Sequence, residues 1–84
     1  MYIHLGQDTV IKQEDIIGIF DMDTSTVSKN TREFLKKAEK EGKVITITYE
    51  LPKSFIVCKI NGETVIYISQ ISSTTLEKRS KMYF

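Results

Sequence analysis

The sequence predicts an α+β fold: a small, mostly antiparallel sheet with one main helix over residues 27–41 and a short C-terminal helix. Three observations lead to this prediction. Short β-rich runs fill the first 20 residues, apolar side chains then recur with helical spacing, and two apolar runs flank the dipeptide Asn61-Gly62. No internal repeat or second domain is apparent, so the sequence is expected to form a single domain, 1–84.

Three short strands are predicted at the N-terminus. Residues 2–5 form a β-rich run that ends at the turn-forming residues 6–8, and residues 9–11 and 16–20 form two further runs. Gly18 lies inside the third run, where an isolated glycine indicates a β-bulge or a close backbone approach. The beginning of the chain is therefore expected to be mostly sheet.

The helix over residues 27–41 is predicted from its apolar stripe. The residues of this stripe are Val27, Phe34, Leu35 and Ala38. Residues 30–33 fit a capping box, although a start near Asp23 or Thr24 agrees equally well with the sequence. Gly42 is expected to end the helix, because glycine readily adopts the positive φ that a helix C-terminus often needs.

Residues 44–51 are predicted to form a strand with one solvent-exposed face. Apolar and polar side chains alternate along this segment, as Ile45, Ile47, Tyr49 and Leu51 against Thr46, Thr48 and Glu50. Pro52 is expected to close the strand, because proline cannot donate a ladder hydrogen bond.

A β-hairpin is predicted in the second half of the chain. Asn61-Gly62 joins the runs 55–60 and 63–68, and this dipeptide suits a two-residue turn in which both central residues have positive φ. The turn pairs Ile60 with Glu63, Cys58 with Val65 and Ile56 with Tyr67 on one face, and Val57 with Ile66 and Phe55 with Ile68 on the other. Both faces of the hairpin are apolar.

A homo-oligomer is predicted from these two apolar faces. The helix over residues 27–41 can cover one face, but the N-terminal strands supply only part of a second layer. At the C-terminus, residues 74–77 fit a capping box that opens a short helix before the apolar tail Met82-Tyr83-Phe84. A second copy is therefore expected to complete the core.

The composition points to a cytoplasmic globular protein. The chain is 40% hydrophobic and 27% charged, and no apolar run approaches the roughly 20 residues of a membrane span. Cys58 is the only cysteine, so no internal disulfide can form. Basic groups are unevenly distributed, with six against eight acidic in residues 1–42 and six against three in residues 43–84. An anion-binding surface is therefore expected to draw on the second half.

No catalytic site is predicted. Asp21, Asp23 and Thr24 follow an apolar strand as in the first motif of the haloacid dehalogenase phosphatases, but the later lysine and acidic pair have no counterpart here. A strand that ends near a helix N-terminus explains the motif better. His4 is the only histidine, and Cys58 is interpreted as a small hydrophobe, so neither a metal nor another cofactor is expected.

Lysine and arginine side chains are the candidate contacts to DNA phosphates. The candidates are Lys53, Lys78, Arg79, Lys81, Arg32 and Lys36. The helix carries basic residues every three or four positions, but Glu33 to Lys37 and Glu39 to Lys43 have the spacing of ordinary solvated ion pairs. In a symmetric assembly each lysine is repeated, so several weak phosphate contacts can act together.

The order of several short motifs resembles the RemA/RemB family of extracellular-matrix (biofilm) regulators, in particular its RemB branch. These motifs are residues 2–6, 16–21, 33–37, 52–54 and 72–79. The resemblance covers nearly the whole chain and implies a bacterial regulator of matrix operons. It also implies ring-shaped oligomers with DNA held on the outside by arginines.

At two positions, the residues of this sequence differ from those expected in the RemA branch of the same family. An arginine before the third strand is replaced here by Asp15, and an arginine-rich loop by residues 50–54, in which only Lys53 is basic. Two hypotheses follow. The chain is a non-enzymatic regulator whose oligomer presents Lys53 and other lysines to duplex DNA, or it is an oligomeric interaction module that acts on transcription through a protein partner.

Overall fold

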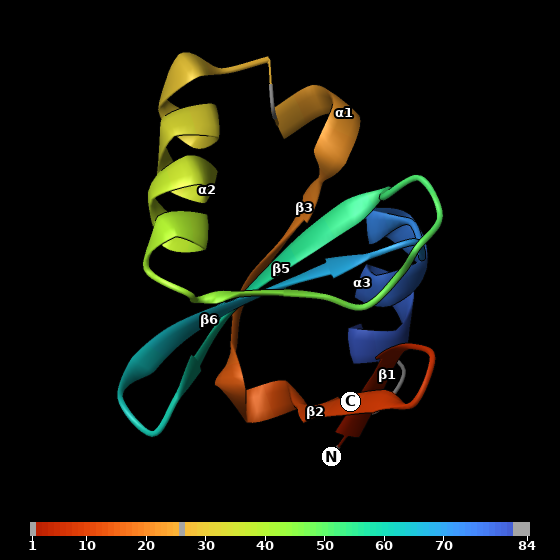
Figure 1. The fold of residues 1–84 in the computed structure, drawn as a ribbon. Helices are drawn as coiled ribbons and strands as arrows, with labels where there is room; N and C mark the ends of the chain where they lie inside the picture. Colours follow the sequence, from red (N-terminus) through yellow and green to blue (C-terminus); the bar gives the residue numbers. More distant parts are fainter. Residues whose placement is uncertain (1, 26, 82–84) are drawn as a thin grey trace.

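A computed structural model describes residues 2–25 and 27–81 and has the predicted α+β architecture (Figure 1). The elements in chain order are β1 (Tyr2–Gly6), β2 (Thr9–Lys12), the 3-10 turn η1 (Gln13–Asp15), β3 (Ile16–Asp21), α1 (Met22–Ser25), α2 (Lys29–Lys40), β4 (Val44–Thr46), β5 (Ser54–Ile60), β6 (Glu63–Ser69) and α3 (Ser73–Lys81). Strands β3, β5, β6 and β4 form one sheet in that order, and β1 pairs with β2 in a separate hairpin. The main sheet is antiparallel except between β4 and β6.

The hairpin of β5 and β6 has the predicted register. Ile60 lies opposite Glu63 and Cys58 opposite Val65, as the two-residue turn requires. Asn61 has φ 52° and Gly62 φ 82°, so both central residues adopt the positive φ of this turn type. The prediction from the dipeptide is confirmed in detail.

The strand predicted over residues 44–51 is much shorter than expected. Only Val44–Thr46 pairs with β6, and Ile47 then donates one more backbone hydrogen bond to the Ile68 carbonyl. Beyond that point the alternation fails, because Tyr49 is 104% exposed and Leu51 83% exposed. These two side chains therefore lie outside the core.

Thr48 causes this early end. Its hydroxyl donates a hydrogen bond to the side-chain oxygen of Gln70 and accepts one from the Glu50 N–H at 2.9 Å. Thr48 is thereby buried, although the alternation of apolar and polar residues predicted that it lies on the solvent-exposed face of the strand. The side chain turns the backbone away from the sheet, in competition with the strand ladder.

The edge strand β3 contains the predicted bulge at Gly18. Its register against β5 shifts between Ile16 and Gly18. The missing side chain also makes room for Phe20, since a Cβ on Gly18 would lie 2.7 and 2.8 Å from two carbons of the Phe20 ring. That ring stacks on Phe55, with 5.1 Å between centroids.

Gly18→Ala is therefore expected to lower the free energy of unfolding by about 1 kcal/mol, because the Phe20 ring must leave its stacked position. Chemical denaturation followed by circular dichroism measures this change. In the double variant with Phe20→Ala the clash disappears, so Gly18→Ala should cost less in that background. An equal cost in both backgrounds would contradict this explanation.

Helix α2 begins later and is capped differently than predicted. The residue before its first turn is Ser28, so residues 30–33 lie inside the helix and do not form a capping box. Val27 precedes the helix and is exposed, outside the apolar stripe to which it was assigned. The possible earlier start near Asp23 corresponds to the separate short helix α1.

The C-terminal end of α2 agrees with the prediction. Gly42 has φ 71° and donates its N–H to the Glu39 carbonyl, while the Lys43 N–H reaches the Ala38 carbonyl at 2.9 Å. This pair of bonds is the Schellman arrangement, which satisfies carbonyls at the end of a helix. Gly42 thus ends α2 and aims the chain into β4.

The two faces of the sheet are covered by different segments of the same chain (Figure 1). Under α2 lies a cluster formed by Ala38, Phe55 and Ile66. The opposite face packs against β1, β2 and α3 in a cluster of Ile3, Leu5, Ile11, Ile47, Ile56, Cys58 and Leu76. The predicted C-terminal helix thus packs on the face for which a second copy was expected, a contact that was not foreseen, and the homo-oligomer itself stays a prediction.

The capping residue of helix α3 lies two residues before the predicted one. The Ser72 hydroxyl accepts a hydrogen bond from the Thr75 N–H at 3.2 Å, so Ser72 and not Thr74 caps the helix. The helix lays Leu76 against the sheet with no exposed surface. The predicted apolar tail Met82-Tyr83-Phe84 lies outside the described residues.

Candidate nucleic-acid interface

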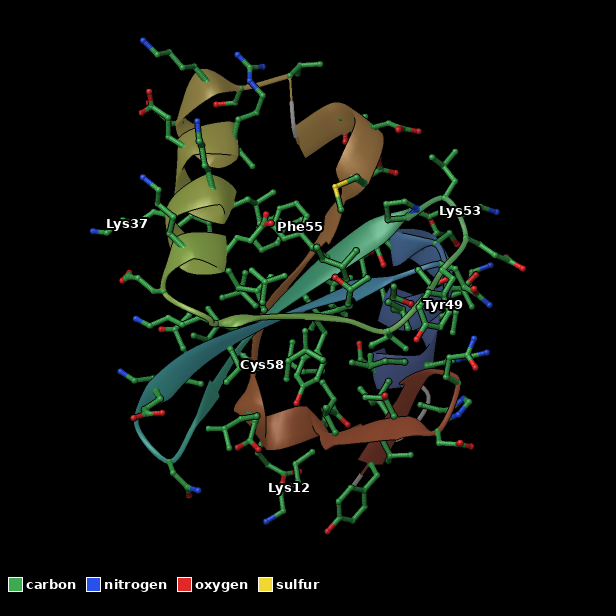
Figure 2. All side chains as sticks on the ribbon, in the orientation of Figure 1. Lys12, Lys37, Tyr49, Lys53, Phe55 and Cys58 are labelled. Carbon is green, nitrogen blue, oxygen red and sulfur yellow. The ribbon has the colours of Figure 1, made fainter. Side chains whose placement is uncertain are left out.

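Lys53 occupies a fixed position at the end of the loop between β4 and β5. Its backbone N–H donates to the Ser69 carbonyl and its own carbonyl accepts from the Met22 N–H, both at 2.9 Å. The Lys53 residue is nevertheless exposed. Figure 2 shows it at the margin of the molecule near α1. The structure therefore holds the backbone in place and leaves the ammonium group available to an anion.

A buried hydroxyl network holds this end of the sheet together. Ser69 donates from its hydroxyl to the Leu5 carbonyl at 2.6 Å and accepts the Ile71 N–H at 3.0 Å. Ser54, which lies opposite Ser69, donates to the Ile71 carbonyl at 2.7 Å. Both serines are fully buried, so these bonds replace the hydrogen bonds that water would make to the hydroxyls in the unfolded chain.

Sequence reasoning missed this network. The sequence feature that could have indicated the network is the presence of hydroxyl residues at the ends of two apolar runs, at Ser54 and at Ser69. The network joins the N-terminal hairpin, the β5–β6 hairpin and the segment leading into α3. It thereby fixes the segment to which the Lys53 backbone is bonded.

The candidates on α3 lie on one face of the sheet. Lys78 is exposed. Arg79 uses one terminal nitrogen, Nη1, to donate to the His4 carbonyl at 2.9 Å, which ties α3 to β1. Lys81 is the last described residue of the helix. Arg79 therefore has a structural role in addition to any contact with DNA.

The candidates on α2 lie on the other face. Arg32 donates from Nη1 to the Val27 carbonyl at 3.0 Å, and Lys36 is exposed. Glu33 forms its ion pair with Lys29 at 3.9 Å, one turn earlier in the helix than the predicted pairing with Lys37. Since α2 and α3 cover opposite faces, one subunit does not bring all six candidates onto one surface (Figure 1).

The residues considered for catalysis have structural roles. One carboxylate oxygen of Asp21 accepts the N–H groups of Asp23 and Thr24, at 2.8 and 3.1 Å, and so caps α1. Cys58 is buried, and burial followed by the nearby Asp15 carboxylate raises the pKa of its thiol to about 11. A thiol with so high a pKa is a poor nucleophile at neutral pH.

Metal-binding clusters and membrane-spanning helices are both absent from residues 2–25 and 27–81. In this part of the chain, no group of three or more His, Cys, Asp or Glu side chains is placed to hold a metal ion. No helix in the same residues has the length and apolar character needed to cross a membrane.

Comparison with known families identifies the relationship of the chain. The model of a family described as RemA-like, or extracellular matrix regulatory protein A-like, matches residues 2–80. The chain belongs to the RemA-like family. Over 84 residues it is also 44% identical to extracellular matrix regulatory protein B of Bacillus subtilis (strain 168), covering 100% of this chain and 95% of that protein. The resemblance to the RemB branch, inferred from the motifs, is confirmed.

Asp15 and Lys53, at which the resemblance implies a difference in charge from the RemA branch, lie far apart in the subunit. Asp15 precedes Ile16, which pairs with Cys58 in β5, whereas Lys53 precedes Ser54, which pairs with Asp21 at the other end of the same ladder. Asp15 therefore does not neutralise Lys53 directly. Its carboxylate lies instead at the opposite end of this ladder, where it contributes to the raised pKa of Cys58 and of Tyr67.

Proposed function

We propose that this protein is a non-enzymatic regulator of extracellular-matrix gene expression in the bacterial cytoplasm. Membership of the RemA-like family and the similarity to extracellular matrix regulatory protein B support a regulatory role. We further propose that a homo-oligomer binds duplex DNA through phosphate contacts centred on Lys53. The observation that carries this proposal is the exposed ammonium group on a backbone fixed at both its N–H and its carbonyl.

A fixed backbone favours anion binding because less conformational freedom is lost when the ion pair forms. A single lysine contributes little, but repetition around an oligomer multiplies its effect. Phosphate contacts carry no sequence information by themselves. The proposed binding is therefore strongly salt-dependent and only weakly selective among sequences.

Lys53→Glu is expected to weaken DNA binding about equally for different duplex sequences. The slope of log affinity against log salt should become shallower by about 0.9 for each phosphate that the protein no longer neutralises. Fluorescence anisotropy of labelled duplex DNA, titrated with protein at several salt concentrations, measures both effects.

Lys37→Glu is the matched control for this experiment. It changes the net charge equally, and Lys37 lies on α2, across the molecule from Lys53 (Figure 2). The control variant should retain more affinity and a steeper salt slope than Lys53→Glu. Equal losses of affinity in the two variants would mean that the effect depends only on net charge and not on the position of Lys53. Absence of binding by the unaltered protein at low salt would refute direct DNA binding.

A second candidate function is that of an interaction module acting through another protein. The observation that favours it is the exposure of two large apolar side chains, Tyr49 and Leu51, in the same loop as Lys53. Exposed apolar groups close together are characteristic of protein-binding surfaces. Under this alternative Lys53→Glu leaves transcription control intact, whereas substitutions at Tyr49 and Leu51 remove it.

A further inference from the structure

An apolar hollow lies between α1, α2 and the edge strand β3, on the face of the sheet that α2 covers. Its volume of about 510 Å³ is within the range of pockets that bind small molecules. None of the six candidate DNA contacts is among its described lining residues. The hollow is therefore separate from the proposed DNA interface and needs an explanation of its own.

The apolar part of the lining is rich in aromatic rings. Its residues are Ile17, Phe20, Phe34, Phe55 and Val57. The rings of Phe20 and Phe55 stack with 5.1 Å between their centroids and 17° between their planes. Phe55 is 2% exposed, on the side of the sheet that faces α2 (Figure 2), whereas Phe20 and Phe34 are 40% and 45% exposed. The hollow thus presents preformed aromatic surface to solvent, and a flat aromatic ring can pack against it.

The polar part of the lining comes from one stretch of the chain, which runs from α1 into the start of α2. Its residues are Thr24, Ser28, Asn30 and Thr31. The side chain of Ser28 makes no capping hydrogen bond to α2. Hydroxyl and amide groups can both donate and accept hydrogen bonds. The hollow therefore offers hydrogen bonds on the side of α1 and the α2 start, and apolar contact elsewhere.

The charge of the lining limits the kind of ligand that fits. None of the described lining residues has an ionisable side chain, although Asp, Glu, Lys and Arg make up 27% of the sequence. A charged ligand group placed among these residues would lose hydration without gaining an opposite charge, which is strongly unfavourable. An uncharged aromatic group gains from leaving water. The lining therefore favours an uncharged ligand over an ion.

We propose that this hollow is a binding site for an uncharged aromatic small molecule that carries a hydroxyl or carbonyl group at one end. The aromatic body packs against Phe20, Phe34 and Phe55, and the polar end faces Asn30 and Thr31. This inference goes beyond the proposed function and does not depend on it. Its test contains no DNA, so the two can fail separately.

The first experiment titrates the unaltered protein with phenylnaphthylamine, an uncharged aromatic probe whose fluorescence rises when it leaves water. We expect saturable binding of one probe per chain. Anilinonaphthalenesulfonate has the same ring system with a negative charge, so it should bind at least about tenfold more weakly. Absence of saturable binding by the uncharged probe, or equal affinity for the two probes, would overturn the proposal.

Ile17→Glu and Val10→Glu form a matched pair that locates the binding site. Both replace an exposed β-branched residue of a strand, 63% and 52% exposed, with the same charged group, but only Ile17 lines the hollow. Ile17→Glu should weaken the binding of phenylnaphthylamine at least about tenfold, and Val10→Glu by less than about twofold. Phe34→Ser takes the place of Ile17→Glu if circular dichroism shows that the latter is unfolded. A loss no greater than that of Val10→Glu would contradict the assignment of the site.

Naphthol and naphthalene, used as competitors of phenylnaphthylamine, test the hydrogen-bonding side of the hollow. Naphthol should displace the probe at a concentration about threefold lower than naphthalene, because its hydroxyl can bond to the polar lining residues. Thr31→Val removes one hydroxyl with little change of shape and should reduce this preference. Tighter binding of naphthalene, or an unchanged preference in Thr31→Val, would contradict the proposed orientation of the ligand.

Discussion

Replacing Leu76 with alanine is expected to lower the free energy of unfolding by about 3 kcal/mol. Leu76 has no exposed surface and packs in the same cluster as Leu5, Ile56 and Cys58. The shorter side chain buries less apolar surface and leaves a cavity that the surrounding strands can fill only in part. Urea denaturation followed by circular dichroism measures the change.

Thr74→Ala is the matched control on the same helix. Thr74 is exposed and is not the residue that caps α3, so its replacement should change the free energy of unfolding by no more than about 0.5 kcal/mol. If Leu76→Ala were as mild as this control, α3 would not be an integral part of the core.

The result for Leu76 bears on assembly as well as on stability. The sequence suggested that one face of the sheet needs a second copy, but α3 and the N-terminal hairpin cover that face. The expected homo-oligomer therefore does not follow from an uncovered face at this position, and it stays a prediction.

Local chemistry was enough to predict the β5–β6 hairpin and the end of α2. Asn61, Gly62 and Gly42 adopt positive φ at turns whose geometry depends on a few neighbouring residues. The end of β4 was not predictable in this way. It depends on the hydrogen bond of Thr48 to Gln70, a residue 22 positions later, and nothing in the alternation of residues 44–51 indicates this partner.

The candidate site was predictable only in part for the same reason. Lys53 was chosen as a candidate because it is the basic residue of its loop, and its role stays a prediction. The burial of Ser54 and Ser69, which fixes the surrounding backbone, requires knowledge of which strand ends meet. Likewise, a sequence does not reveal that α2 and α3 pack on opposite faces, and this arrangement separates Arg32 and Lys36 from the α3 candidates.

The stability of the protein is expected to fall by about 2 kcal/mol as the pH rises from about 9 to about 11, owing to Cys58. Burial, and secondarily the charge of Asp15, raises the pKa of this thiol from 9.0 to about 11. The unfolded chain then loses the thiol proton at lower pH than the folded chain. The contribution is fully present below pH 9 and is lost as the pH passes through the folded pKa.

Cys58→Ala removes this contribution together with the effect of Cys58 on the pKa of Tyr67. The variant starts from a lower stability because a buried side chain is shortened, so the informative quantity is the change between pH 8 and pH 11 in each protein. That change should be smaller in Cys58→Ala than in the unaltered protein. The pKa of Tyr67 is raised first by burial and then by the charge of Cys58, so Cys58→Ala removes the second cause and lowers the Tyr67 contribution to the alkaline loss as well. Identical pH dependence in the two proteins would mean that the Cys58 thiolate is accommodated in the fold, against the burial that the structure assigns to it.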